Sequence, residues 1–241
     1  MNFKVIFLVL CLFSMACKNA TVSNPAKRKY HAQLTDAYRV AFLIMDGTYN
    51  TEFTAPYDIF QHTRFRDGIK PMDVFTVAKS HDAITTFEGV KVLPDYSYML
   101  DSLPPIDVLV VPSAEHHLDS DRADSTLIRW VRQVSQTARY VTSHCDGAFI
   151  LAQAGVLNGH VCTTFPDDIG RLRSEYPALD VRDDVLFVHD GPLITSAGGA
   201  RSFDAALYLC ERLYGVSVAR RIAEGLVIDW NLQTVPHLIV Q

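Results

Sequence analysis

Short apolar runs alternate with segments of helical periodicity along most of the chain of 241 residues. Continuous apolar or β-branched runs predict strands over 39–44, 74–78, 90–93, 107–111, 140–143, 186–189 and 193–195. Apolar residues at helical spacing predict helices over 52–62, 125–138, 146–154, 202–213 and 218–225. The run DVLVV over 107–111 ends at Pro112 and is typical of a central parallel strand.

This repeated alternation of strand and helix predicts an α/β protein whose mostly parallel sheet is covered by helices on both faces. Internal repeats, a change of composition and an internal linker are all absent from the sequence after about residue 38. We therefore expect one domain over 38–241.

The first residues have a different pattern. Residues 1–16, MNFKVIFLVLCLFSMA, place one lysine before a short apolar run and are predicted to be a lipoprotein signal peptide. Ser14 and Ala16 precede Cys17 at the spacing of a bacterial lipobox, which predicts lipidation of Cys17. Plain signal cleavage, with Cys17 as a bystander, is the alternative. Residues 17–37 lack an apolar period and are expected to form a tether. We therefore expect a protein of the bacterial cell envelope, either lipid-anchored, with the anchor as its only contact with the membrane, or periplasmic.

Composition narrows the function classes. A hydrophobic fraction of 49% excludes a fully disordered chain, and a net charge of -5 disfavours a nucleic-acid partner. ATP and NAD pools are absent from the envelope, so we expect a small-molecule substrate or ligand and no cofactor. The same compartment permits a disulfide between Cys162 and Cys210, which the sequence leaves open.

The richest segment for chemistry is YVTSHCDGAFILAQAGVL over 140–157. A predicted strand runs into Cys145 and a helix begins almost at once, which is the arrangement of a nucleophile elbow. The positive end of that helix favours a thiolate, whereas the like charge of Asp146 raises the thiol pKa. A buried, inert Cys145 is the alternative interpretation.

Three segments in order, MDGTYNTEFTAPYDIF, HCDGAFILAQAGVLNGHVCTTFP and GPLITSAGGARSFDAALYLCERLYG, resemble the ThiJ/PfpI superfamily, which is also called class I glutamine amidotransferase-like. The resemblance covers about 38–230 and is strongest to isonitrile-hydratase-like proteins and to ligand-binding domains of AraC-type regulators. It implies a flavodoxin-like three-layer α/β/α sandwich, usually a homodimer, with Cys145 as the reactive residue and Glu52 beside its sulfur. Without the resemblance, Glu52 reads as a solvated acid in a first helical turn.

Two positions depart from the family pattern. The histidine that serves as the common base is replaced by Phe165, which cannot take a proton but is a candidate pocket residue. The threonine that follows the cysteine in isonitrile hydratases is replaced by Asp146. These departures put a literal transfer of that activity in doubt.

The loop after the strand 107–111 offers other polar groups at the carboxyl edge of the sheet, where ligands bind. Its family Gly-Gly pair is replaced by Ser113 and Ala114, whose N–H groups are candidates for an oxyanion site. His116 and His117 follow, either as pocket residues, as solvated surface side chains or, with Glu115, as weaker candidates for a metal site. His144 precedes Cys145 and is expected to point to the other face of the strand.

We therefore expect a cofactor-independent hydratase or hydrolase that acts on a small electrophilic carbon, such as an isonitrile. Cys145 is the predicted nucleophile, Glu52 the proton shuttle and Asp146 a third catalytic candidate. The alternative is a non-catalytic small-molecule or redox-sensing domain, in which Phe165 marks the loss of the base. Glutamine amidotransfer is disfavoured because the sequence lacks a recognisable Cys–His–Glu triad.

Overall fold

The computed structural model describes residues 34–240. The predicted signal peptide, the lipidation site Cys17 and most of the predicted tether lie outside the described residues and stay predictions. Within the described range, every helix is too short or too polar to cross a membrane.

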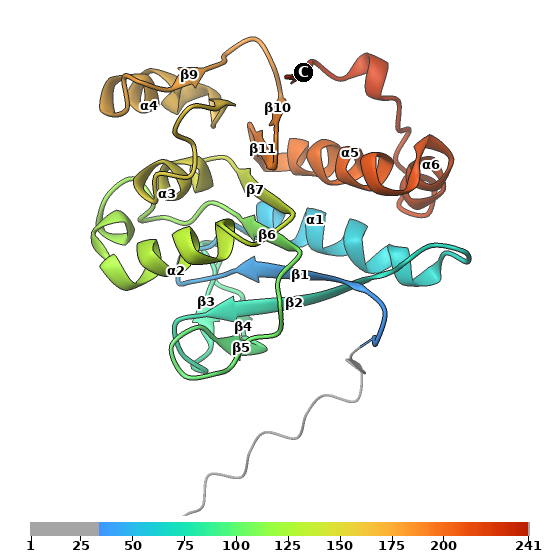
Figure 1. Ribbon diagram of the computed structural model, residues 1–241, viewed down its shortest axis with the longest axis horizontal. Helices are drawn as coiled ribbons and strands as arrows, with labels where there is room; N and C mark the ends of the chain where they lie inside the picture. The colour runs from blue at the N-terminus through green and yellow to red at the C-terminus, as the bar shows by residue number, and fades with distance from the viewer. Residues whose placement is uncertain (1–33, 241) are drawn as a thin grey trace, which may run out of the picture. The chain divides into compact units, whose positions relative to one another are not determined.

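The strands of residues 34–240 form an eight-stranded main sheet in the order β12-β10-β11-β7-β6-β1-β2-β5 (Figure 1). Their bounds are β1 Tyr38–Leu43, β2 Met72–Ala78, β5 Tyr96–Ser97, β6 Val108–Val111, β7 Tyr140–His144, β10 Phe187–Asp190, β11 Leu193–Ser196 and β12 His237–Ile239. Among neighbouring strands, β10 and β11 pair antiparallel and the remaining pairs are parallel. The predicted mostly parallel sheet is confirmed.

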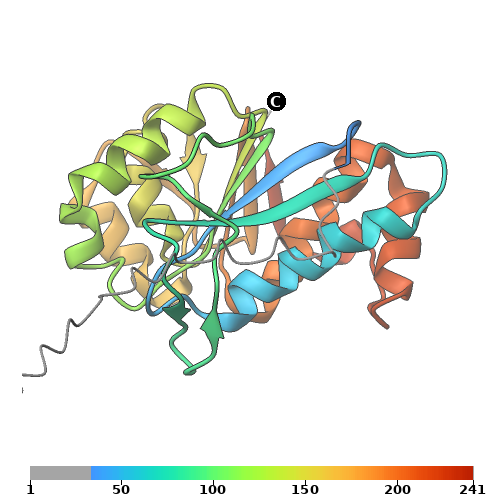
Figure 2. The ribbon, with the colours of Figure 1, turned by 90° about the horizontal axis from the view of Figure 1, so that it is seen from below.

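Helices cover both faces of this sheet (Figures 1 and 2). One face carries α1 Asn50–Gln61, α5 Ser202–Tyr214 and α6 Val216–Glu224, and the other carries α2 Ser125–Ser135, α3 Gly147–Gln153 and α4 Ile169–Glu175. Each face has its own apolar core, with Phe42 and Leu207 buried in the first and Leu109 and Phe149 in the second. The expected three-layer α/β/α sandwich is therefore present.

The helix α2 shows how the sequence sets an element. The Asp124 carboxylate caps it by accepting hydrogen bonds from the N–H groups of Thr126 and Leu127. Apolar residues at helical spacing, Leu127 and Val131 among them, then enter the second core. The helix ends at Ser135 and not at the predicted residue 138, because the next turn tightens into a bond from the Gln136 N–H to the Gln133 carbonyl.

Short elements depart most from prediction. The predicted strand 90–93 is only β4 Lys91–Val92, which pairs antiparallel with β3 Ile84–Thr85 outside the main sheet. The strands β3, β5, β12, β8 Val161–Cys162 and β9 Asp180–Val181 were not predicted, because runs of two or three residues are held by their partners and carry no periodicity of their own. The seven-residue helix α4 was not predicted either, because only Ile169 and Leu172 on it are buried apolar residues, too few to show a helical period. Short 3-10 turns complete the described elements at η1 His62–Phe65, η2 Ser120–Ala123, η3 Pro166–Asp168, η4 Gly199–Arg201 and η5 Leu232–Thr234.

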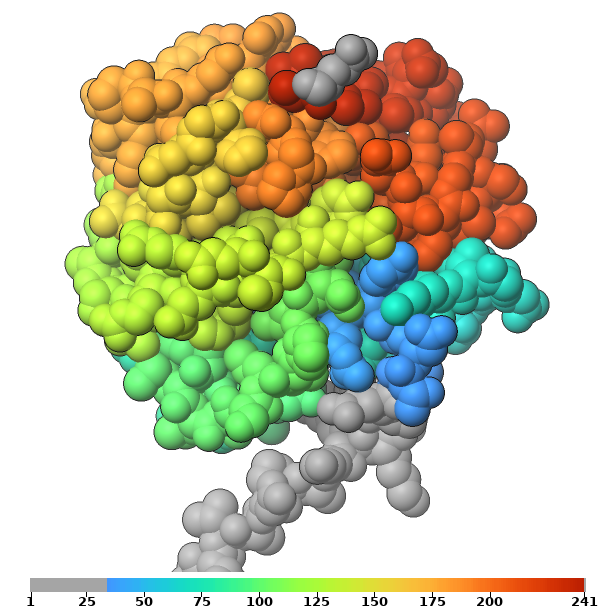
Figure 3. Space-filling model, viewed as in Figure 1, coloured from blue at the N-terminus to red at the C-terminus, as the bar shows by residue number. Residues whose placement is uncertain are grey.

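Segments far apart in sequence lie against each other on the first helical face. The loop after α1 contacts the region of α6 in the space-filling view (Figure 3), and the Arg66 guanidinium donates a 2.7 Å hydrogen bond to the Arg221 carbonyl. On the same face α1 packs against α5. These contacts hold α1, whose first turn carries Glu52, and the loop that follows it against the other helices of this face.

Candidate functional site

Cys145 occupies a sharp turn between β7, which ends at His144, and α3, which begins at Gly147. Its backbone has a φ of 51°, and only Val227 shares a positive φ among the described residues other than glycine. Such a conformation is costly for an L-residue and persists only where the surroundings impose it. Here the Cys145 N–H donates to the Ser196 carbonyl at 2.9 Å, and the Thr164 hydroxyl donates to the Cys145 carbonyl at 2.9 Å. The turn predicted from the sequence is present, and it holds Cys145 firmly.

Two glycines permit this turn. A Cβ at Gly147 would lie 2.1 Å from the Val111 carbonyl oxygen, so α3 can begin against the end of β6 only with glycine there. A Cβ at Gly198 would lie 2.4 Å from the Cys145 Cβ, and Gly198 also has a φ of +79°. The loop after β11 therefore passes directly over the cysteine.

Glu52 lies in the first turn of α1 and is buried, with 5% of its surface exposed. Its Oε2 accepts a 3.0 Å hydrogen bond from the Ser113 N–H, and its Oε1 accepts one of 3.0 Å from the Gly199 N–H. Its carboxyl also lies within hydrogen-bonding reach of the Cys145 thiol. Burial raises the pKa of Glu52, and these hydrogen bonds oppose the rise. The interpretation of Glu52 as a solvated surface acid is wrong.

Asp146 brings a second carboxyl to the same sulfur. Burial raises the pKa of Asp146 to about 7, and the negative charges of Asp168 and Glu52 add to the rise. The Thr164 hydroxyl, 3.5 Å from Oδ1, and the Cys145 thiol favour the ionised form. Asp146 is only partly buried, so its carboxyl, unlike that of Glu52, also meets solvent.

The Cys145 thiol is neutral at rest. Burial raises its pKa far above the usual range, and the charges of Glu52 and Asp146 raise it further. The Asp146 N–H and the Ser113 hydroxyl act in the opposite direction but do not cancel the rise. The end of α3 does favour a thiolate as expected, through the Asp146 N–H, but desolvation and two nearby carboxyls outweigh this effect of a helix of only seven residues.

The backbone of the loop after β6 does not provide the expected oxyanion site. The Ser113 N–H is bonded to Glu52, and the Ala114 N–H donates a 3.2 Å hydrogen bond to His117 Nδ1. Both donors expected to meet a substrate anion are therefore used within the protein. The sequence could not reveal this, because their partners come from α1 and from the next turn of the loop.

The histidines divide into buried and exposed groups. His117 is 1% exposed, and burial lowers its pKa to about 3, so it is neutral. Its contacts are with Ala114, Asp121 and the Asp146 backbone and do not include the sulfur. His116 is exposed and lies 3.4 Å from Asp119. His144 points away as expected, because its Nδ1 lies 2.8 Å from the Ser196 hydroxyl.

The weaker metal hypothesis for this loop is not supported. Across residues 34–240, side chains of His, Cys, Asp and Glu do not gather in a group of three or more that could hold a metal ion. Glu115 and His116 face solvent, whereas His117 is buried against the site loop. The three consecutive side chains therefore point to different environments.

Sequence reasoning missed two residues near the sulfur. Tyr49 lies just before α1. Burial raises the pKa of its hydroxyl, and the nearby charges of Cys145, Glu52 and Asp146 raise it further. Its ring stacks on Phe87 with centroids 4.5 Å apart. Thr164 touches both Cys145 and Asp146, while the following Phe165 is 37% exposed. The available signal was that Tyr49 lies only three residues before Glu52 in the sequence, at the start of the same helix.

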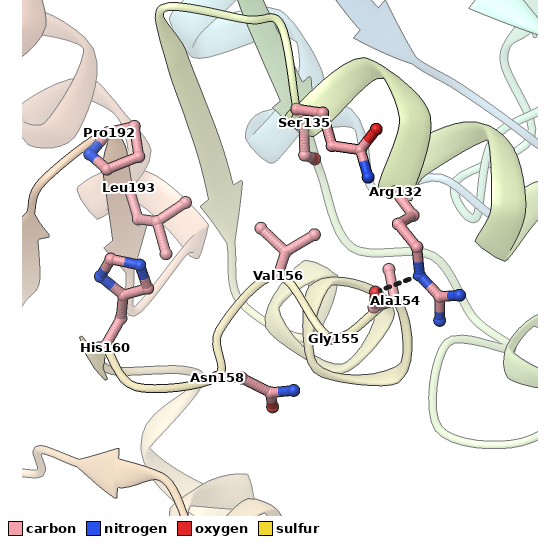
Figure 4. Close-up of a pocket in the computed structure, with 10 residues that line it drawn as sticks. Arg132, Ser135, Ala154, Gly155, Val156, Asn158, His160, Pro192 and Leu193 are labelled. Carbon is pink, nitrogen blue, oxygen red and sulfur yellow. Dashed lines mark hydrogen bonds between the residues drawn. The ribbon is translucent and has the colours of Figure 1, made fainter.

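A cavity of about 440 Å³ lies elsewhere, between the ends of α2 and α3 and the start of β11 (Figure 4). Since β11 runs parallel to β7, the start of β11 is at the sheet edge opposite to Cys145. The Arg132 side chain lies along one side of the cavity, and its Nε donates a 2.8 Å hydrogen bond to the Ala154 carbonyl, at the end of α3. This cavity contains none of the residues around the sulfur.

The fold and the elbow cysteine define a class of α/β proteins with a buried cysteine facing an acid from the first βα loop. The sequence profile of the DJ-1/PfpI family matches residues 38–212, so the chain belongs to this family. It is 29% identical over 189 residues to the isonitrile hydratase of Pseudomonas putida, which covers 77% of this chain and 76% of that protein.

Several other relatives are transcriptional regulators. The chain is 34% identical over 102 residues to the HTH-type transcriptional regulator CdhR of Pseudomonas aeruginosa, covering 42% of this chain and 30% of the regulator. A solved ThiJ/PfpI family protein from Pseudomonas syringae superposes with a TM-score of 0.71 at 21% identity, covering 88% of this chain and 84% of that chain. The last comparison supports the fold alone, and the predicted homodimer stays a prediction.

Proposed function

We propose that this protein is a cofactor-independent hydratase in which Cys145 adds to a small electrophilic carbon, with an isonitrile as the preferred substrate class. The observation that carries the proposal is a neutral, buried thiol within hydrogen-bonding reach of two carboxyls, Glu52 and Asp146. The similarity to an isonitrile hydratase over most of the chain supports the choice of substrate class.

A neutral thiol suits this chemistry. The terminal carbon of an isonitrile carries a lone pair and must gain both a proton and a sulfur substituent. In the first step the Cys145 sulfur bonds to that carbon while the thiol proton passes through a carboxyl to the same carbon, giving a thioimidate. Water then adds to the C=N carbon, and the C–S bond breaks to release an N-substituted formamide and restore the thiol. Atoms balance, and the reaction needs no oxidant or reductant.

The two carboxyls support different steps. Glu52 is buried and fixed by two backbone N–H groups, so we assign it the proton transfer between sulfur and carbon. Asp146 meets solvent and has a pKa of about 7, so we assign it the activation of water for the second step. This pair replaces the family histidine whose position is taken by Phe165.

Single-turnover mass spectrometry with an aliphatic isonitrile tests these roles. The parent protein is expected to release the formamide, and Cys145→Ala to release none. Asp146→Asn should accumulate the thioimidate on Cys145, whereas Glu52→Gln should slow its formation by about 10²-fold or more. Turnover by Cys145→Ala at the parent rate would refute the proposal.

The alternative function is ligand sensing without turnover. It is favoured by the similarity to the regulator CdhR and by the strongly raised pKa of the Cys145 thiol. In that case an isonitrile or related small molecule would bind in a defined stoichiometry, without formamide and without a covalent adduct. Calorimetric titration beside the turnover assay separates the two functions.

A further inference from the structure

Ser113 is fixed on both sides of its backbone. Its N–H donates to Glu52 Oε2 at 3.0 Å, and its carbonyl accepts a 3.1 Å hydrogen bond from the Tyr49 N–H. The next residue, Ala114, donates to His117 Nδ1 and forms a bridge with Thr48. The hydroxyl of Ser113 is therefore carried by a backbone with little freedom to move.

That hydroxyl is buried without an ordinary partner. Ser113 is 1% exposed, and within the described part of the chain its Oγ forms no conventional hydrogen bond. It lies beside the Cys145 sulfur, where it favours negative charge on that atom. A buried hydroxyl left without a partner is costly, and proteins rarely keep one without a reason.

We propose that the Ser113 hydroxyl is a further catalytic residue, which donates a hydrogen bond to Cys145 Sγ as negative charge develops on the sulfur. The inference rests on the proposed role of Cys145 as the reacting group, but not on the identity of the substrate. The Ser113 and Ala114 N–H groups already donate hydrogen bonds to Glu52 and His117, so they are not available to the sulfur. The Ser113 hydroxyl gives the same loop another way to stabilise negative charge on Cys145. The Ser113 side chain therefore stabilises the negative charge that the backbone N–H groups of this loop were expected to stabilise.

The test measures the alkylation rate of Cys145 by iodoacetamide at pH 8 in the full chain, located by peptide mass spectrometry. Loss of a hydrogen bond to a charged sulfur raises a thiol pKa by about one unit, and the greater nucleophilicity of the more basic thiolate offsets about half of this effect. Ser113→Ala is therefore expected to react about threefold more slowly than the parent. Ser113→Thr, which keeps the hydroxyl, should stay near the parent rate.

Ser202→Ala is the matched control, because Ser202 is also fully buried and its hydroxyl also lacks a partner among residues 34–240. Its alkylation rate should equal the parent rate. An unchanged rate in folded Ser113→Ala, or an equal fall in Ser202→Ala, would overturn the proposal. If Ser113→Ala does not fold, Ser113→Gly takes its place with the same expected fall. Because alkylation needs no turnover, this experiment tests the role of Ser113 even if the protein has no hydratase activity.

Discussion

At the scale of single residues, the site is built from groups that are each unfavourable alone. Cys145 has a strained φ of 51°, and Glu52 is an almost fully buried acid. Ionisation of Asp146 is unfavourable in the folded protein, since burial and neighbouring acids raise its pKa to about 7. Groups held in such states are typical of sites that bind or transform ligands, because stability alone would remove them.

The raised pKa of Asp146 makes stability depend on pH. Its ordinary value is 3.8 and its folded value about 7, so the folded protein binds more protons, and stability falls as pH rises between these values. Asp146→Asn replaces the carboxyl with an uncharged amide and so removes the loss of stability that its ionisation causes. We expect the variant to be about 1–3 kcal/mol more stable than the parent at pH 8, after allowance for partial solvent exposure, and equal to it below pH 4. Urea denaturation at both pH values measures the difference.

Glu52→Gln is the contrasting variant in the same measurement. Both Glu52 oxygens accept backbone N–H groups, and glutamine keeps only one acceptor oxygen. One buried N–H then loses its partner, so this variant is expected to be less stable than the parent by about 1–3 kcal/mol at pH 8. Stabilisation by Glu52→Gln and destabilisation by Asp146→Asn would contradict the assigned environments.

At the scale of elements, the site depends on how closely α3 approaches β6. The first residue of the helix, Gly147, meets the carbonyl of the last strand residue, Val111, with no room for a side chain. This contact sets where the helix begins and therefore where Cys145 projects. The sheet order places β7 parallel beside β6, so the loop that carries Ser113 begins next to the cysteine.

Gly147→Ala is therefore expected to destabilise the protein strongly. Its Cβ would lie 2.1 Å from the Val111 oxygen, and backbone must shift to relieve the overlap. We expect a loss of about 2–4 kcal/mol in the free energy of unfolding. Gly170→Ala in α4 is the control, because nothing lies within 4 Å of its added Cβ. The control should gain up to about 1 kcal/mol, and comparable losses in both variants would show that the close approach is not the cause.

At the scale of the whole described body, the sheet separates two apolar cores. Cys210 on α5 belongs to the first core and Cys162 on β8 to the second. Both thiols are free and buried. The disulfide that the sequence left open is therefore absent in this fold, because its two halves lie on opposite faces of the sheet.

Native and denatured thiol labelling tests this separation. We expect Cys162 and Cys210 to be unreactive with iodoacetamide in the native protein, since both are buried, and fully labelled in guanidinium without any reductant. Peptide mass spectrometry locates the label on each cysteine. A Cys162–Cys210 peptide linked by a disulfide, or labelling that requires a reductant, would disprove the arrangement.

The sequence by itself determined the fold class and the position of the elbow. Long apolar runs such as 107–111 must be buried on both faces, so they predict central parallel strands wherever they occur. The strand into Cys145 followed at once by a helix has one common geometry, and the three family-like segments placed Glu52 near it. Elements of two or three residues escaped prediction, because their stability comes from partners distant in the chain.

Only the tertiary structure decided the chemistry of the site. The pKa of the Cys145 thiol depends on burial and on carboxyls that converge from α1 and from the elbow, so the local helix end was a misleading guide. The same convergence uses the N–H groups of Ser113 and Ala114 and leaves the Ser113 hydroxyl beside the sulfur. A hydrogen-bond partner is a property of three-dimensional distance, whereas the sequence records only which donors and acceptors are available.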